Sequence, residues 1–277
     1  MTLTSLIIIL LATGLAIGFI SGLLGIGGGI IMTPVQYWLY TSHGISGEVA
    51  IKLAFATSLA VILPTAASGV WQHQKRGSIN WKAAALMGIF TAVGSFTGAS
   101  LAAHIPGAVL KICFGLLTLL VAIRMLTVKI QDVDRPIRQN YWLWFALAFP
   151  LGVITGILGI GGGILVIPVL VLVLRFRMHN AVGTSLAMML FTSAGGILGY
   201  IVNGLHVTGL PDHTLGYIYW PAWLALAAGS MILAQLGAIT AHKVKGRYLN
   251  YLLVALLFYI SLDMLGVIGW IGRLLLG

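Results

Sequence analysis

The chain has 277 residues, of which 60% are hydrophobic and 7% are charged, whereas about 25% of the residues of a typical soluble domain are charged. This composition excludes a soluble globular protein, because too few polar side chains remain to cover its surface. The formal net charge of +10 does not indicate a nucleic-acid partner. The lysines and arginines lie in short segments between apolar runs, where the preference of basic residues for cytoplasmic loops accounts for them.

Apolar runs long enough to cross a bilayer recur from one end of the chain to the other. They cover residues 5–24, 53–70, 81–103, 109–126 and 248–270, and about 20 apolar residues span the hydrocarbon core of a membrane. The first run has neither a basic leading segment nor a small-residue cleavage site, so we expect a retained span and not a signal peptide. The sequence predicts an all-α, multi-pass membrane protein, which we expect in the plasma (inner) membrane, surrounded by the lipid bilayer.

The first apolar run ends in a glycine cluster that occurs twice. "LLGIGGGIIMTPV" begins at Leu23 and "ILGIGGGILVIPV" begins at Ile157. Glycine in a helix interior costs about 0.5–1 kcal/mol relative to alanine, so both clusters predict a break in the helix. A short apolar segment follows each cluster and carries a proline one turn in, which we also expect to break the helix. The residues concerned are Gly25, Gly27, Gly28, Gly29 and Pro34, and Gly159, Gly161, Gly162, Gly163 and Pro168.

A second motif, "ATSLA" and its counterpart "GTSLA", follows the glycine clusters. It supplies two hydroxyl pairs, Thr57 with Ser58 and Thr184 with Ser185, near the start of an apolar span. Such hydroxyls can donate hydrogen bonds to an anion, or they can bond back to carbonyl groups of their own helix. Both interpretations stay open for the isolated motif, and its duplication favours the binding site.

The chain is a duplicated unit. The two glycine clusters are 134 residues apart, the two "TSLA" motifs are 127 apart, and residues 81–126 match residues 220–265 at an offset of 139 without a gap. Three matches in the same order predict a first transmembrane repeat at 1–126 and a second at 141–277. Between them, "TVKIQDVDRPIRQN" at 127–140 is the longest polar stretch, and we predict that it is a cytoplasmic linker.

The distribution of basic residues favours inverted repeats. If each unit is a broken or re-entrant helix pair followed by three transmembrane helices, the halves are inverted and twelve of the 15 lysines and arginines lie on one side. If the glycine element crosses the membrane once, the halves are parallel and the same residues divide seven to eight. Because basic residues concentrate on the cytoplasmic side, we predict two inverted repeats with both ends of the chain outside.

Helix breaks at equivalent places in inverted halves are typical of a transporter's substrate site. Non-helical backbone at membrane depth needs partners for its N–H and C=O groups. A glycine-rich turn followed by a helix N-terminus can direct several N–H groups at one small anion. The alternative is that the glycines only let helices pack closely. A dinucleotide site is excluded, because no acidic residue follows about 20 positions later and no strand–turn–helix unit can form in hydrocarbon.

The glycine cluster with its proline, followed by a "TSL" span and present twice, resembles the sulfite exporter TauE/SafE family. The resemblance covers essentially the whole chain, and the family motif falls on the glycines and prolines named above. It implies a secondary transporter of sulfur-containing anions such as sulfite, thiosulfate or organosulfonates. It does not choose among these substrates or between import and export.

We therefore predict a secondary anion transporter that works by alternating access, with the anion held between the two glycine breaks near the midplane of the membrane. The predicted substrate-binding residues are the glycines of both clusters with Thr57, Ser58, Thr184 and Ser185. H⁺ or Na⁺ is the expected coupled ion. No cofactor, metal or catalytic residue is expected, so the chain is not predicted to be an enzyme. An intramembrane enzyme and a non-transporting assembly subunit remain the alternatives.

Four other polar residues lie within or at the ends of apolar runs, where ionisable and amide groups are functional candidates. They are His104, Arg124, Gln235 and Asp263. Arg124 and Asp263 are equivalent at the offset of 139, so an ion pair between the halves is one interpretation. Contact with water at the membrane interface is the other, and the position of both residues near the ends of spans favours it.

Overall fold

The computed structural model describes residues 3–24, 28–127, 138, 140–240 and 246–268. The first half contains α1 (Leu3–Leu24), α2 (Gly29–Ser42), α3 (Gly47–Lys75), α4 (Trp81–His104) and α5 (Gly107–Thr127). The second half contains α6 (Tyr141–Leu158), α7 (Gly163–Pro168), the π-helix η1 (Val169–Val173), α8 (Met178–Gly204), β1 (Thr214–Leu215), β2 (Ile218–Tyr219), α9 (Trp220–Thr240) and α10 (Gly246–Met264). Most of the predicted linker, residues 128–137 and 139, lies outside the described part.

Several helices of the described part are long and apolar enough to cross a membrane. They are α3, α4, α5, α6 and α8. Shorter apolar helices run over Ile7–Ser21, Gly163–Val173, Trp220–Leu236 and Leu253–Met264. The prediction of an all-α polytopic membrane protein is confirmed.

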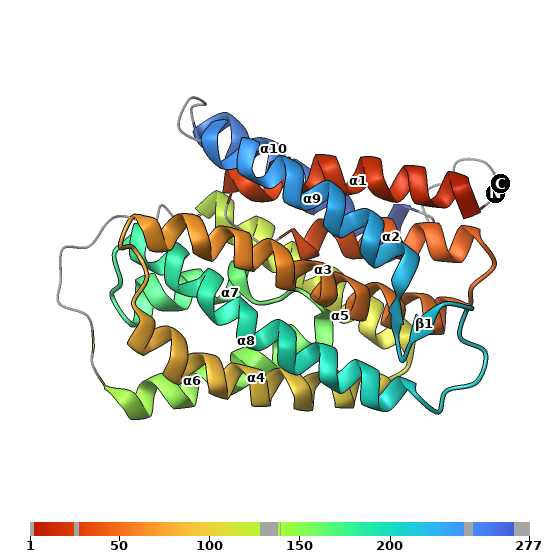
Figure 1. Ribbon diagram of the computed structural model, residues 1–277, viewed down its shortest axis with the longest axis horizontal. Helices are drawn as coiled ribbons and strands as arrows, with labels where there is room; N and C mark the ends of the chain where they lie inside the picture. The colour runs from red at the N-terminus through yellow and green to blue at the C-terminus, as the bar shows by residue number, and fades with distance from the viewer. Residues whose placement is uncertain (1–2, 25–27, 128–137, 139, 241–245, 269–277) are drawn as a thin grey trace.

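The molecule has two ends along its long axis. At the linker end, on the left of Figure 1, α3 ends and α4, α6 and α8 begin. At the hairpin end, on the right, α3 begins and the strands β1 and β2 lie. Two asparagines cap helices at the linker end. Asn80 accepts a hydrogen bond from the backbone N–H of Ala83 at 3.0 Å, and Asn140 accepts one from Leu143 at 3.3 Å. Each satisfies an N–H group that has no partner within its helix.

Equivalent helices of the two halves run in opposite directions along this axis. α1 starts at the hairpin end and α6 starts at the linker end (Figure 1). Likewise α3 runs from the hairpin end to the linker end, and α8 runs back. Two inverted repeats require such an arrangement, and the side of the membrane on which each end lies stays a prediction.

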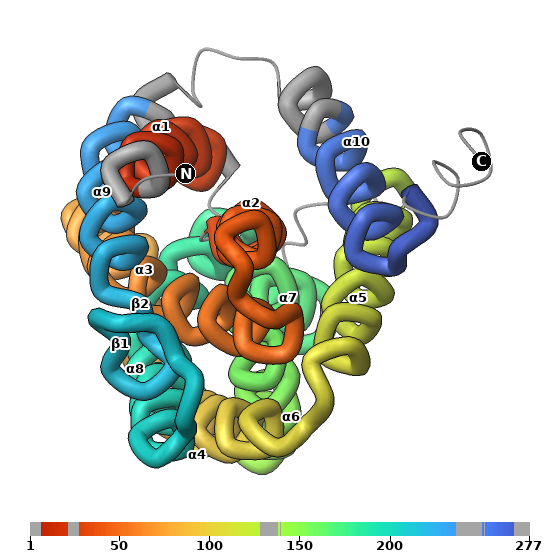
Figure 2. Tube along the Cα trace, turned by 90° about the vertical axis from the view of Figure 1, so that its right-hand side faces the viewer, coloured from red at the N-terminus to blue at the C-terminus, as the bar shows by residue number. Residues whose placement is uncertain are grey.

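Each half packs its first helix against the other half. α1 lies along α9 and α6 lies along α4 (Figures 1 and 2). A methyl group on Gly18 of α1 would lie 2.5 Å from the Cα atom of Ser230, and one on Gly152 of α6 would lie 2.4 Å from the carbonyl oxygen of Thr91. The offsets of 134 and 139 relate these two contacts. Gly18 and Gly152, which lie outside the two clusters, therefore serve close helix packing.

The helices that begin at Gly29 and Gly163, α2 and α7, lie near the centre of the molecule. Figure 2 looks along the helices and shows α2 and α7 in the middle, with α3 beside them. The apolar core has two parts, one that includes Tyr40 and Phe55 and another that includes Trp144. Val61 belongs to the first part and Ile62 to the second, so the two parts meet in the middle of α3.

A short hairpin adds β-structure that the sequence analysis did not predict. Thr214 pairs with Tyr219, and Leu215 pairs with Ile218. Gly216, at the first turn position, has a φ of 56°, a conformation that two-residue hairpin turns use and glycine adopts readily. The hairpin leads into α9 and brings Tyr219 against α3.

Candidate functional site

The second glycine cluster interrupts the helical path between α6 and α7. Gly159 ends α6 with a φ of 64°, and Gly161 and Gly162 follow with φ values of 74° and 103°. Gly163 then begins α7. Left-handed backbone costs other L-residues about 1–2 kcal/mol each, so three of these four positions favour glycine for their conformation alone.

The first cluster forms a break of the same kind between α1 and α2. Gly28 has a φ of 70° and directly precedes Gly29, the first residue of α2. Gly25 and Gly27, which we also predict to bind substrate, lie outside the described residues. The residues described in both clusters have the same arrangement. A left-handed glycine, Gly28 or Gly162, directly precedes the glycine that begins the next helix.

A helix N-terminus begins at each break. The N–H of Met32 donates to the carbonyl of Gly28 at 3.0 Å, and the N–H of Val166 donates to that of Gly162 at 2.8 Å. N–H groups that precede the first such bond have no partner within their own helix. The positive end of the α2 dipole therefore lies at the first break, and that of the α7 dipole at the second.

The two breaks meet inside the protein. A methyl group on Gly29 would lie 3.1 Å from the carbonyl oxygen of Ile160 and 3.2 Å from that of Gly159. The Cδ1 atom of Ile62 in α3 would lie 2.8 Å from the same methyl group and 2.7 Å from one on Gly161. Gly28, Gly29 and residues 159–163 are all buried. Both clusters therefore contribute backbone to one buried place.

Pro34 does not break its helix, which corrects the sequence prediction for that residue. α2 continues through Pro34 to Ser42. At Pro168 the α-helical turns change into the π-turns of η1, and the N–H of Leu174 donates to the carbonyl of Val169 at 3.1 Å. Proline removes one intrahelical hydrogen bond; α2 continues in spite of that loss, whereas α7 ends at Pro168. The left-handed interruptions lie at the glycines.

The threonines of the two "TSL" motifs each bond to the other half. Thr57 Oγ1 accepts a hydrogen bond from the backbone N–H of Tyr219 at 3.1 Å, and Thr184 Oγ1 accepts one from that of Asn80 at 3.1 Å. Both threonines are completely buried. A hydroxyl that accepts one bond still has a proton to donate, so this role is compatible with a ligand contact.

The side chain of Tyr219 is uncharged. Burial raises the pKa of the Tyr219 phenol, and the charge of Asp212 raises it further, so this side chain stays neutral.

The serines of the two motifs differ. Ser185 Oγ donates to the carbonyl of Val182 at 2.9 Å, a bond within its own helix. Ser58 Oγ instead accepts from Gln36 Nε2 at 2.9 Å and lies 3.2 Å from Thr33 Oγ1. The structure therefore places Ser58 in a polar cluster between α2 and α3, and leaves Ser185 bonded to its own backbone.

The α2 residues of this cluster are not among the site residues predicted from the sequence. Thr33, Gln36 and Tyr40 are at most 1% exposed. Gln36 Nε2 also donates to the carbonyl of Met32 at 3.3 Å, and the Tyr40 hydroxyl donates to Gln36 Oε1 at 2.9 Å. Their spacing of three and four residues in an apolar segment was the available signal, since it places them on one helix face.

The comparison with known proteins assigns the family. Residues 10–264 match the family described as sulfite exporter TauE/SafE. The chain belongs to this family. It is 31% identical over 260 residues to the probable membrane transporter protein MJ0441 of Methanocaldococcus jannaschii, covering 93% of this chain and 94% of that protein. It is 25% identical over 276 residues to the probable membrane transporter protein YunE of Bacillus subtilis, covering 93% and 97%. No solved structure matches it significantly.

Membership of the TauE/SafE family confirms the resemblance drawn from the glycine and "TSL" motifs. Together with the apolar helices, it makes this chain a multi-pass membrane transporter. Its curated relatives are likewise described as probable membrane transporters. Among the described residues of this TauE/SafE protein, no group of three or more histidines, cysteines and carboxylates could hold a metal ion.

Two of the other polar residues named from the sequence have described bonds near the surface. His104 is exposed, and its Nδ1 lies 2.8 Å from the carbonyl oxygen of Ser100, one turn earlier. Gln235 is exposed, and its Nε2 donates to Ser68 Oγ at 3.5 Å. Arg124 and Asp263 are half-buried. None of the contacts described for these four residues involves the breaks.

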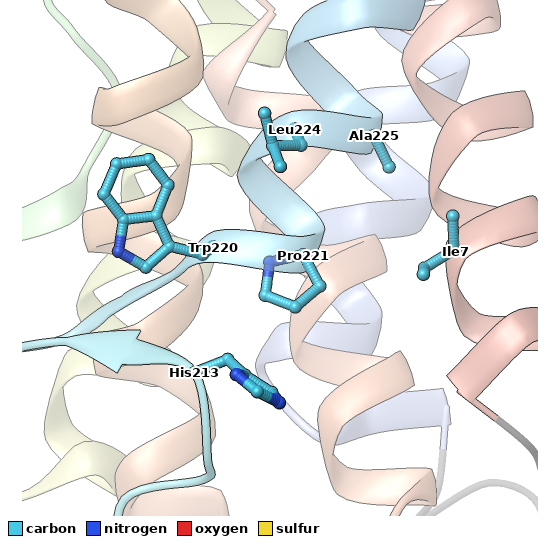
Figure 3. A pocket seen from close by; sticks show the side chains of 6 residues that line it. All are labelled: Ile7, His213, Trp220, Pro221, Leu224 and Ala225. Atoms are coloured by element: carbon cyan, nitrogen blue, oxygen red, sulfur yellow. The ribbon is translucent and has the colours of Figure 1, made fainter.

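A surface groove of about 480 Å³ lies between α1, the hairpin and α9. Figure 3 shows its lining, in which His213 is the one ionisable side chain: Ile7, His213, Trp220, Pro221, Leu224 and Ala225. Trp220 and Leu224 are exposed, as expected for a face that contacts lipid.

Proposed function

We propose that this TauE/SafE protein is a secondary transporter of small sulfur-containing anions, such as sulfite, thiosulfate or an organosulfonate. The anion binds where the two glycine breaks meet, and the protein opens to each side of the membrane in turn. The observation that supports this most is the close approach of Gly29 to the carbonyls of Gly159 and Ile160, which leaves no room for a side chain on Gly29 and brings the breaks of both halves to one place.

The chemistry of the breaks supports an anionic substrate. The N-termini of α2 and α7 begin there, and broken transporter helices direct such positive ends at anionic groups of the substrate. Glycine leaves the backbone N–H groups open to a ligand, because no side chain covers them. The same breaks contain the C-terminal end of α6, and such ends and their carbonyls bind the coupled cation in other broken-helix transporters. We therefore include H⁺ or Na⁺ as the coupled ion.

The arrangement of basic residues supports a location in the plasma (inner) membrane with the linker end in the cytoplasm. Lys75, Arg76, Lys82, Arg175 and Arg177 flank helices at the linker end. Lys52 and Lys111 lie near the hairpin end, in the second turns of α3 and α5. Basic residues favour the cytoplasmic side.

Flux through the purified protein in liposomes tests this proposal. The panel is sulfite, sulfate, thiosulfate, taurine and sulfoacetate, each measured with and without a gradient of H⁺ or Na⁺. We expect saturable flux of at least one sulfur anion that empty liposomes do not show. Absence of flux for every anion would contradict the proposal and favour an assembly subunit.

A further inference from the structure

A buried polar stripe, made of Thr33, Gln36 and Tyr40, follows one face of α2 and has no place in the function proposed so far. Gly29, Thr33, Gln36 and Tyr40 are spaced by four, three and four residues, so they share a helix face. Gly29 lies at the break, and Tyr40 lies near the end of α2, toward the hairpin end. The stripe therefore runs from the place where the breaks meet toward one end of the molecule.

The stripe lies against α3. Ser58 of α3 contacts both Thr33 and Gln36, and Figure 2 shows α2 beside α3. Ser58 is eleven residues into α3, about 17 Å from its start at a rise of 1.5 Å per residue. These polar groups are thus deep in the part of the chain that spans the membrane, where uncharged polar side chains are costly unless they have partners.

The second half does not need such a stripe. At the offset of 134, the positions of Thr33, Gln36 and Tyr40 are taken by Ile167, Leu170 and Leu174, which are all buried. Ser185, the counterpart of Ser58, bonds to its own helix. Polar contacts are therefore not required to pack this segment against the following long helix, because the equivalent segment packs there with apolar side chains.

We infer that Thr33, Gln36 and Ser58 line the passage between the hairpin end and the breaks, and that they donate hydrogen bonds to the oxygen atoms of a passing anion. This inference rests on the proposed function, because it assumes an anion at the breaks. Gln36 Nε2 carries two protons, and each hydroxyl carries one. These donors now bond to Met32, to Ser58 and to one another. Anion oxygens accept the same protons and can replace those partners without leaving a buried donor unpaired.

Thiol labelling tests the passage without requiring the identity of the substrate. Gln36→Cys and Ser58→Cys are made separately in a Cys113→Ser background, and so are the matched controls Leu170→Cys and Ile167→Cys. Intact cells are exposed to the membrane-impermeant reagent methanethiosulfonate ethylsulfonate, which is itself a sulfonate. We expect it to react at positions 36 and 58 at least tenfold faster than at positions 170 and 167. Equal rates at all four positions would overturn the inference.

A second variant covers the case in which a cysteine at position 36 prevents folding. Gln36→Leu copies the residue that the second half already has at the equivalent position. We expect normal abundance and at least a tenfold loss of flux for this variant, whereas Leu170→Met keeps its flux. Unchanged flux in Gln36→Leu would overturn the inference.

The two experiments distinguish the passage from the proposed substrate. If the labelling pattern holds while no sulfur anion moves in liposomes, the passage stands and the proposed substrate is wrong. If a sulfur anion moves while labelling is equal at all positions, the substrate stands and the passage is wrong.

Discussion

Thr57 Oγ1 accepts a hydrogen bond from the backbone N–H of Tyr219, which is 162 residues away in the sequence. The bond joins α3 of the first half to the residue that precedes α9 of the second half. Thr184 makes the equivalent bond to Asn80, which precedes α4. Each half therefore fixes the start of a helix in the other half, at a hydroxyl of the duplicated "TSL" motif.

We predict that Thr57→Val and Thr184→Val each lower the melting temperature of the protein without any ligand. Valine has nearly the shape of threonine but leaves a backbone N–H without its acceptor, which costs about 1–3 kcal/mol where the N–H is buried. The N–H of Tyr219 is buried and that of Asn80 is partly buried, so the larger effect is expected for Thr57→Val. Thermal unfolding of the purified variants in detergent measures the effect. Ser185→Ala is the control, because it removes a bond within one helix and is expected to change the melting temperature little. Unchanged melting with a lost anion response would instead assign the threonines to the ligand alone.

Gly162→Ala tests the second break. The alanine methyl group would meet nothing closer than 3.4 Å, but the φ of 103° is strained for any L side chain. We predict a loss of about 1–2 kcal/mol of stability, together with loss of the rise in melting temperature that a transported anion causes. The stabilisation behind that rise is about 2.7 kcal/mol at one hundred times Kd.

Gly44→Ala is the matched control for Gly162→Ala. Gly44 has a φ of 84°, and a methyl group on it would have no atom within 4 Å other than those of its own chain neighbours. It is exposed in the loop after α2. The variant is expected to lose similar stability and to keep the full response to the anion. If the anion raises the melting temperature of Gly162→Ala as much as that of the unmodified protein, the cluster serves helix packing and not anion binding.

Lys52 is expected to hold the hairpin end together. Its Nζ donates to Glu48 Oε1 at 2.7 Å and to the carbonyl of Ala103 at 2.9 Å, while Glu48 also accepts from the N–H of Gly107. The side chain of Lys52 is only 8% exposed. Lys52→Met should therefore destabilise the protein by roughly 1–3 kcal/mol, as measured by thermal unfolding. The exposed Lys75→Met is the control, and equal melting of the two variants would contradict this role.

Topology is tested by two single cysteines in a Cys113→Ser background. Arg76→Cys lies at the linker end and Thr208→Cys at the hairpin end, and both positions are exposed. We predict that an impermeant thiol reagent labels position 208 in intact cells and position 76 only after the membrane is opened. Labelling of both from the same side would contradict the inverted arrangement.

The broken helices and the duplication could be predicted from the sequence because both depend on local features. Gly159 and Gly162 indicate left-handed backbone by residue type, and the offsets relate Gly18 to Gly152 without any structure. The prediction for Pro34 was wrong for the same reason. Proline is unfavourable within a helix by residue type, but α2 continues through Pro34.

The cross-half bonds and the α2 stripe could not be predicted in the same way. The donors to Thr57 and Thr184 are backbone N–H groups, which no residue type identifies. The spacing of Thr33 and Gln36 shows that they share a helix face. Whether that face meets α3 or lipid depends on tertiary packing, which the spacing does not determine.

Binding of an anion where the two glycine breaks meet is the central claim. A cryo-electron microscopy structure with thiosulfate, and another with sulfite, measures this most directly. We predict anion density at a hydrogen-bond distance of about 3 Å from backbone nitrogens of Gly29 and Gly163. Anion density confined to the basic residues of the linker end, with the breaks empty and still in contact, would contradict the claim.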